Sequence, residues 1–172
     1  MASLIDTLTE ILNGENEEYR KLLDLSEGKT EVIVKGDLNA LSLITDKEQQ
    51  VVSKINALEQ RRTETMTEIA KILNTDVRGL KLENLIDLLK KKPREQRELA
   101  EIHDKLHVTL YQMKGVNERN AELLKTSMEM VDFNLNLIQA MRKAPETANY
   151  NRGAYNTGAQ LGVGSGSFDA KQ

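Results

Sequence analysis

The sequence predicts an all-α protein, an elongated antiparallel three-helix bundle or coiled coil with a flexible C-terminal tail. Charged residues make up 30% and hydrophobic residues 39% of the 172 positions, a balance typical of soluble helical proteins. Two prolines, four tyrosines, two phenylalanines and no tryptophan are little material for sheet cores and tight hairpins. Apolar residues recur at helical spacings over long stretches, which favours helices packed on helices.

Charge and residue usage exclude several kinds of function. A net charge of −3 gives no basic surplus to attract nucleic acid or an anionic membrane. The longest apolar run, Val32–Val34, is far too short for a membrane span, so we expect no membrane insertion. There is no cysteine, and no apolar segment precedes Arg20, the first basic residue, so neither a disulfide scaffold nor a secretion signal is expected. These features favour a cytoplasmic protein with a protein partner.

The first predicted helix begins at Ser3 and ends near Gly36. Ser3 and Asp6 have the spacing of a capping box, in which each side chain satisfies a free amide at the helix start. Gly36 suits the left-handed stop of this helix, and Asp37 is a good N-cap for the next one. The apolar stripe of the first helix consists of Ile5, Leu8, Leu12, Tyr19, Leu22, Leu23 and Ile33.

The second predicted helix begins at Leu38 and has the seven-residue repeat of a coiled coil. Glu48 and Arg62 interrupt the apolar pattern, and polar residues at such positions more often fix the register between helices than perform chemistry. One row contains Ile44, Val51, Leu58 and Ile72, and the other contains Leu41, Ile55 and Ile69.

A turn at 75–79 and a short helix at 82–91 lead to Pro93, which suits the first turn of a third long helix. This helix meets no breaker except a single glycine until Pro145. We therefore expect a helical domain over residues 1–143. Residues 144–172 are rich in Gly and Asn and are expected to form a flexible tail.

No catalytic or cofactor site is expected. His103 and His107 lie four residues apart with Asp104 between them, which superficially resembles a zinc-protease helix. That chemistry needs a glutamate base and a third ligand, and the chain has no further histidine to supply one. The basic run from Lys90 to Arg94 is typical of a solvated helix end. We therefore expect a protein that is not an enzyme and holds no metal or cofactor.

The unusual feature is the second half of the third long helix, which carries two apolar stripes. A three-helix bundle can cover one of them, so the other is expected to need a partner, and methionines suit a surface that accepts another helix. Burial of both stripes within the bundle or in a homodimer is the alternative. We name them the Leu124 stripe, which contains Leu124, Met128, Val131, Leu135 and Ile138, and the Leu123 stripe, which contains Val116, Leu123, Met130, Leu137 and Met141.

Two segments resemble the FlgN-type flagellar export chaperones, and together the resemblance covers about residues 1–143. The later segment is Asn117-x-x-Asn120-x-x-Leu123-Leu124-x-x-Ser127-Met128-x-x-Val131-Asp132-Phe133. The earlier segment contains Glu15, Tyr19, Leu22, Leu23, Lys29 and Ile33, followed by Gly36-Asp37-Leu38 and Ile44-x-x-Lys47-Glu48-Gln49.

This resemblance implies a chaperone that holds the C-terminal helices of hook–filament junction proteins and delivers them to the flagellar export gate. It implies gate contact through a Tyr-Gly segment, for which Tyr150 and Tyr155 are the candidates. A structural coiled-coil homodimer or adaptor without chaperone activity is the alternative. The cargo-binding residues expected from the stripes and the resemblance are Val116, Leu123, Leu124, Met130, Val131, Leu137 and Ile138.

Overall fold

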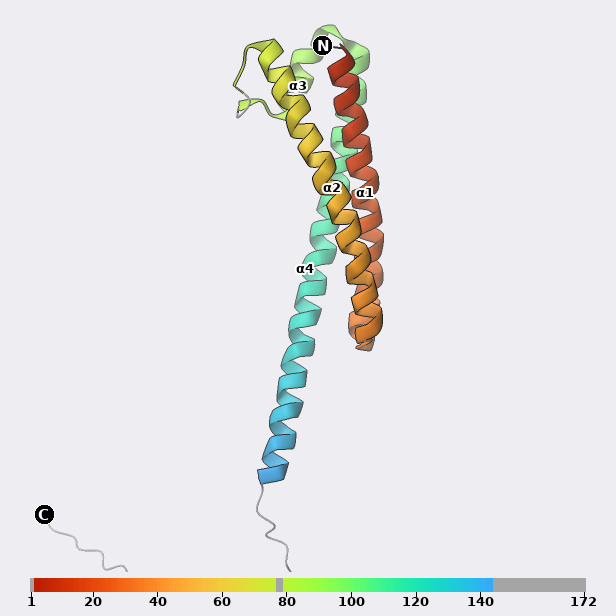
Figure 1. The fold of residues 1–172 in the computed structure, drawn as a ribbon, viewed down its shortest axis with the longest axis vertical. Coiled ribbons are helices and arrows are strands. Elements are labelled where there is room, and N and C mark those ends of the chain that lie inside the picture. Colours follow the sequence, from red (N-terminus) through yellow and green to blue (C-terminus); the bar gives the residue numbers. More distant parts are fainter. Residues whose placement is uncertain (1, 77–78, 144–172) are drawn as a thin grey trace, which may run out of the picture. The chain divides into compact units, whose positions relative to one another are not determined.

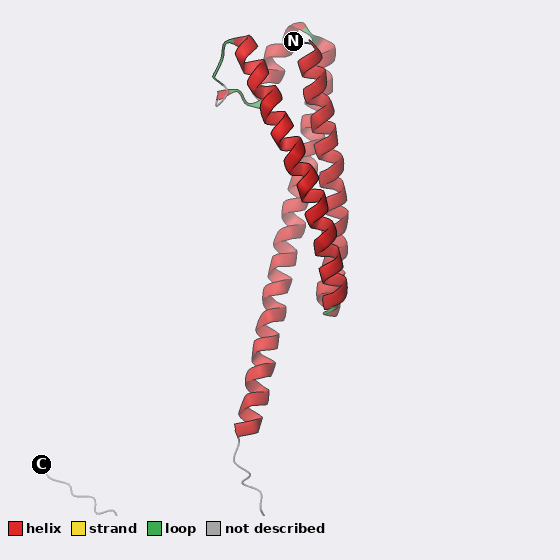
Figure 2. Ribbon diagram, viewed as in Figure 1, coloured by secondary structure: helices red, strands yellow, loops and turns green. Residues whose placement is uncertain are grey.

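The computed structural model describes residues 2–76 and 79–143, and every regular element in these ranges is a helix (Figures 1 and 2). The chain divides into a unit that ends at Met130 and a second that begins at Val131. The all-α prediction is confirmed. The elements are α1 (Ala2–Lys35), α2 (Leu38–Leu73), α3 (Leu82–Leu88), the 3-10 helix η2 (Leu89–Lys91) and α4 (Pro93–Lys143).

The turn between α1 and α2 forms where the sequence predicted it. Gly36 has a φ of +68°, and its amide donates to the Ile33 carbonyl at 3.1 Å. Asp37 is the N-cap of α2, and its carboxylate accepts from the Ala40 amide at 3.0 Å. The left-handed glycine and the capping aspartate together close α1 and α2 into an antiparallel hairpin (Figure 1).

The other end of the hairpin leads into α4 through short elements. Asn74 closes α2 in the left-handed conformation, with its amide directed at the carbonyls of Ala70 and Lys71. Pro93 opens α4, as predicted, because a first-turn residue has no need of its missing amide. Two predicted boundaries differ slightly: α1 begins at Ala2, before the expected cap at Ser3, and the expected short helix ends in a 3-10 turn.

The hydrophobic core lies at the end of the hairpin where α3 packs. Ile5, Leu8 and Leu12 of the predicted α1 stripe are fully buried there, and each such side chain contributes roughly 1.5–3 kcal/mol. Their buried neighbours in the cluster are Ile69, Ala70, Leu80, Leu85, Leu89, Leu99, Ile102 and Leu106.

The prediction that Ile72 continues the buried row of α2 is wrong, because its side chain is 53% exposed. A straight α-helix drifts by about 20° per heptad relative to a strict seven-residue repeat. From Ile44 to Ile72 this drift turns the row away from the core. Leu73 lies on the inward side instead and packs against the cluster.

Polar pairs across the hairpin fix its register, as predicted for Glu48 and Arg62. Glu48 accepts from Lys29 at 2.7 Å and from Ser26 at 3.0 Å. Arg62 Nε lies 3.2 Å from Glu15 Oε1, an ion-pair distance, although this buried oxygen makes no hydrogen bond. Sliding α1 along α2 by one turn would break both pairs.

The Glu15 carboxyl lies at the hairpin interface in a strongly desolvating environment. Burial raises its pKa above the ordinary value of 4.5, the nearby Arg62 opposes this, and Glu59 adds to it. Burial also raises the pKa of Tyr19 to about 12, helped by the hydrogen bond that its hydroxyl donates to Glu59 at 3.0 Å. Ionised Glu15 is therefore held in the hairpin at some cost in stability.

We predict that the stability of the wild type relative to Glu15→Gln declines as the pH rises. The folded-state pKa of Glu15 is raised, so the folded protein binds the proton more tightly than the unfolded chain does. Any stability from this proton is complete below pH 4.5 and is lost as the pH rises through the folded-state pKa. Urea unfolding of both proteins from about pH 4 to pH 8 measures this difference.

Glu31→Gln is the control with the opposite sign. The hydrogen bond from Lys35 lowers the pKa of the exposed Glu31, so its contribution is present above pH 4.5 and is lost in acid. If the stability of the wild type relative to each variant changed with pH in the same direction, the raised pKa of Glu15 would be contradicted.

Two glycines of α1 and its turn are expected to respond in opposite ways to alanine. Gly36→Ala places a Cβ at a positive φ and should destabilise the fold by about 1 kcal/mol. Gly28→Ala lies inside α1 with open space around it and should stabilise by roughly 0.5–1 kcal/mol. Thermal and urea unfolding measure both changes, and equal shifts in one direction would show that the turn does not depend on the left-handed glycine.

Candidate partner-binding surface on α4

The face of α4 that packs in the bundle is one continuous row, which we call the α4 seam. Its buried members follow one another at spacings of three and four, the repeat of a coiled coil. They are Leu99, Ile102, Leu106, Thr109, Met113, Val116 and Asn120.

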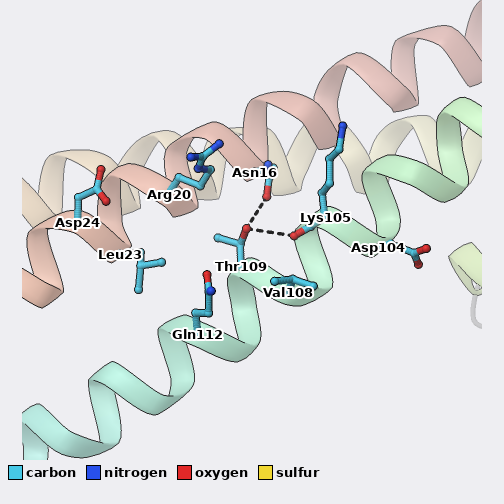
Figure 3. A pocket seen from close by; sticks show the side chains of 9 residues that line it. All are labelled: Asn16, Arg20, Leu23, Asp24, Asp104, Lys105, Val108, Thr109 and Gln112. Carbon is cyan, nitrogen blue, oxygen red and sulfur yellow. Dashed lines mark hydrogen bonds between the residues drawn. The ribbon is translucent and has the colours of Figure 1, made fainter.

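The polar residues of the buried seam meet polar partners on α1. Thr109 donates to the Asn16 amide oxygen at 2.8 Å (Figure 3). Asn120 is 5% exposed, and it donates to the Ser26 carbonyl at 2.7 Å and accepts from Thr30 at 2.5 Å. Two buried polar positions are thus hydrogen-bonded rather than left without partners, which avoids a large desolvation penalty.

These contacts make α1 and α4 parallel neighbours and fix their register. The Asn16–Thr109 and Ser26–Asn120 pairs join residues 93 and 94 positions apart in the sequence. Since α1 ends at Lys35, this register gives α4 a facing α1 residue only up to about position 128. The end of α1 therefore determines how much of the α4 seam is covered.

Beyond that position the seam continues at the same spacing. It passes through Leu123, Ser127, Met130, Asn134, Leu137 and Met141. Apart from Ser127 and Asn134, these residues belong to the Leu123 stripe. The Leu124 stripe lies beside them on the same helix.

Both stripes are exposed toward the end of α4, which corrects the expectation that the bundle covers one of them. Val131 of the Leu124 stripe is 56% exposed, and Met130 of the Leu123 stripe is 62% exposed. The Leu123 stripe continues the residue spacing of the buried seam. Neither stripe is fully covered, because the register gives α4 no facing α1 residue beyond about position 128. The exposed apolar residues are Met128, Met130, Val131, Phe133, Leu135, Leu137, Ile138 and Met141.

The expected cargo-binding residues fall into three groups. Val116 is only 9% exposed and belongs to the bundle core, so it differs from the others. Leu123 and Leu124 are half-buried at the edge of the bundle. Met130, Val131, Leu137 and Ile138 are exposed and lie on one apolar side of the helix. Such a side has the chemistry to receive an amphipathic helix.

The histidine pair has no metal site around it. The His103 and His107 rings stack with centroids 6.5 Å apart, and His103 Nε2 lies 3.5 Å from Glu83. Within residues 2–76 and 79–143, no group of three potential ligand side chains could hold a metal ion. The basic run at Lys90 is likewise a set of surface pairs with neighbouring carboxylates.

A groove between α1 and α4 has no catalytic arrangement either (Figure 3). Its lining mixes opposite charges, with Arg20 and Asp24 on α1 and Asp104 and Lys105 on α4. Thr109, its central hydroxyl, is bonded to Asn16 and to the Lys105 carbonyl, and among the described residues no hydrogen bond joins it to a histidine or a carboxylate.

The expected tail residues Tyr150 and Tyr155 lie outside the described residues. Among the residues that are described, no helix is long and apolar enough to cross a membrane.

A family model described as FlgN protein matches residues 1–157. The chain belongs to the FlgN family. This is a family of flagellar chaperones, and the resemblance found in the sequence is confirmed. The chain is also 27% identical over 135 residues to an uncharacterized protein, YvyG, of Bacillus subtilis (strain 168), covering 77% of this chain and 76% of that protein. No solved structure matches the chain significantly.

Sequence reasoning missed the contact between Asn120 and α1. The sequence analysis gives Asn120 only as part of the segment that resembles the FlgN-type family, and it does not single out Ser26 or Thr30. The available signal was the spacing of seven from Leu106 through Met113 to Asn120, which places the asparagine in the packed row. In this FlgN family member the asparagine marks the last fully buried position of the seam.

We expect Asn120→Ala to destabilise the fold by about 1–3 kcal/mol, because the Thr30 hydroxyl and the Ser26 carbonyl lose their buried partner. Asn117→Ala is the matched control on the exposed side of the same helix, and it should stay within about 0.5 kcal/mol. Urea unfolding compares the two. A loss no larger for Asn120→Ala than for Asn117→Ala would show that the α1–α4 hydrogen bonds do not hold the register.

Proposed function

We propose that this protein is a cytoplasmic chaperone of flagellar type III export that binds the C-terminal helices of hook–filament junction proteins. The observation that carries the proposal is the exposed apolar side of α4 between Met128 and Met141. A contiguous row of exposed Met, Leu, Val and Ile is unfavourable in water and is typical of a surface that another molecule covers.

The shape and chemistry of this surface suit a helix as ligand. Its residues follow helical spacings of three and four, which is the pattern that an amphipathic helix packs against. Methionines at 128, 130 and 141 can adapt to side chains of different shape. Membership in a family of flagellar chaperones supports junction proteins as the source of that helix.

Delivery to the export gate is the second part of the proposal. We assign gate contact to the segment after α4 that contains Tyr150 and Tyr155, on the strength of the family resemblance and the Tyr-Gly spacings. Separate sites for cargo and gate would let the chaperone hold one partner while it contacts the other.

Self-association is a second candidate, favoured by the spacing of the Leu124 stripe. Its five members are separated by four, three, four and three residues, which is the repeat of a coiled coil. A homodimer through this stripe would make the chain a structural adaptor. The two functions differ in whether the exposed side is free to bind cargo.

We predict that Met130→Asp leaves folding unchanged and weakens cargo binding by at least about tenfold, because a charge would be buried against an apolar helix. Unfolding should shift by no more than about 0.5 kcal/mol, since Met130 is exposed. Val131→Asp should behave in the same way. Thermal unfolding together with titration of a junction-protein C-terminal peptide measures both effects.

Asn136→Asp is the control, because it adds the same charge on the polar side of the same helix and should bind cargo like the wild type. The cargo proposal is refuted if Met130→Asp and Asn136→Asp bind the peptide equally well. Loss of a concentration-dependent dimer by Val131→Asp, without peptide binding by the wild type, would instead support the adaptor.

A further inference from the structure

The α4 seam contains a polar residue at every seventh position from Asn120 to Asn134. Asn120, Ser127 and Asn134 occupy the same place in successive heptads, between apolar residues of the Leu123 stripe. A polar residue at such a position typically costs stability and selects register and partner. The three residues therefore occupy equivalent positions of the repeat and differ in how far α1 covers them.

Where α1 covers the seam, the polar residue is matched by a specific arrangement. Asn120 donates to the backbone carbonyl of Ser26 and accepts from the hydroxyl of Thr30, one turn later on α1. The small Ser26 side chain is itself buried, so the asparagine reaches the α1 backbone. Ser26-x-x-x-Thr30 is thus the arrangement that accommodates an asparagine in this seam.

Asn134 is the position where this arrangement is missing. Ser127 donates to the Leu123 carbonyl of its own helix at 2.9 Å and needs no outside partner. The Asn134 side chain is exposed, and within the described part of the chain no hydrogen bond to it is found. Water satisfies its amide while the surface is open, and any helix laid over the seam removes that water.

We propose that Asn134 is a specificity-determining residue for the partner helix of the surface described above. The occupant is an amphipathic helix that carries a small residue and, four positions later, a Ser or Thr within its apolar face, as α1 does at Ser26 and Thr30. This inference rests on the proposed function and specifies the chemistry of its ligand. A purely apolar helix is disfavoured, because it would bury the Asn134 amide without a partner.

A partner helix fits the seam better than a second copy of this chain. The exposed part of the seam keeps the residue spacing of the row that α1 covers up to about residue 128, so its pattern suits one more helix with the arrangement found on α1. In a second copy of this chain, Ser26 is buried and both Ser26 and Thr30 are already bonded to that copy's own Asn120. A helix from another protein can present the same arrangement with its groups free.

The test is a specificity measurement with junction-protein C-terminal helical peptides from the source organism, in which each Ser and Thr is changed to Val in turn. Binding is measured by calorimetric titration with the full-length wild type, Asn134→Leu and Asn136→Leu. The wild type should lose about tenfold in affinity, equivalent to roughly 1.4 kcal/mol, at one Ser or Thr of the apolar face. Asn134→Leu should abolish this loss, and the matched control Asn136→Leu should retain it.

The outcomes separate this inference from the function on which it rests. Peptide binding that shows the same Ser/Thr-to-Val response in Asn134→Leu and Asn136→Leu, or no response in the wild type, overturns the role of Asn134 and leaves the chaperone proposal standing. Absence of binding to every peptide overturns both. A dimer that Asn134→Leu strengthens and Asn136→Leu does not would place a second copy on the seam, which also overturns the inference. Asn134 is exposed, so both variants should unfold at the same temperature as the wild type.

Discussion

The parallel register of α1 against α4 is the constraint on which the rest of the arrangement depends. It is set by the polar contacts of Thr109 and Asn120 with α1, and it places the end of α1 opposite about residue 128 of α4. The Gly36-Asp37 turn then fixes that end, because a left-handed glycine and a capping aspartate stop the helix there. The length of α1, and not the composition of α4, therefore determines how much of the α4 seam is covered.

The two kinds of polar contact in the bundle have different effects. The Glu15–Arg62 and Lys29–Glu48 pairs lock α1 to α2, with one carboxylate held in an environment that penalises its charge. The contacts of Asn120 are between neutral groups and connect α1 to α4. Neutral amide–hydroxyl pairs specify alignment without the desolvation cost of a buried ion.

Much of the fold could be predicted from local sequence signals. The turn at Gly36, the capping role of Asp37 and the opening of α4 at Pro93 depend on single residues whose backbone preferences are strong. Ile72 was misplaced because a seven-residue repeat is only an approximation to the pitch of a straight helix. Boundaries that depend on weak caps shifted by a residue or two.

The candidate site was predictable in composition but not in extent. The two apolar stripes are visible in the sequence, whereas the point at which α4 loses its cover depends on which residues of α1 lie opposite it. That pairing arises from contacts between residues about 90 positions apart, such as Thr30 with Asn120, and neither segment reveals it alone. For the same reason Val116 was expected at the cargo-binding surface although it belongs to the core.

The absence of any buried side chain between residues 131 and 143 of α4 has a consequence for amide hydrogen exchange. A short helical segment without tertiary packing is only marginally stable in water, because the cost of ordering its backbone is not offset by burial. Its amides should exchange with solvent much faster than those around Leu106, where the helix is packed. A bound ligand would slow that exchange by supplying the missing packing, so part of its binding free energy would be used to order the helix that receives it.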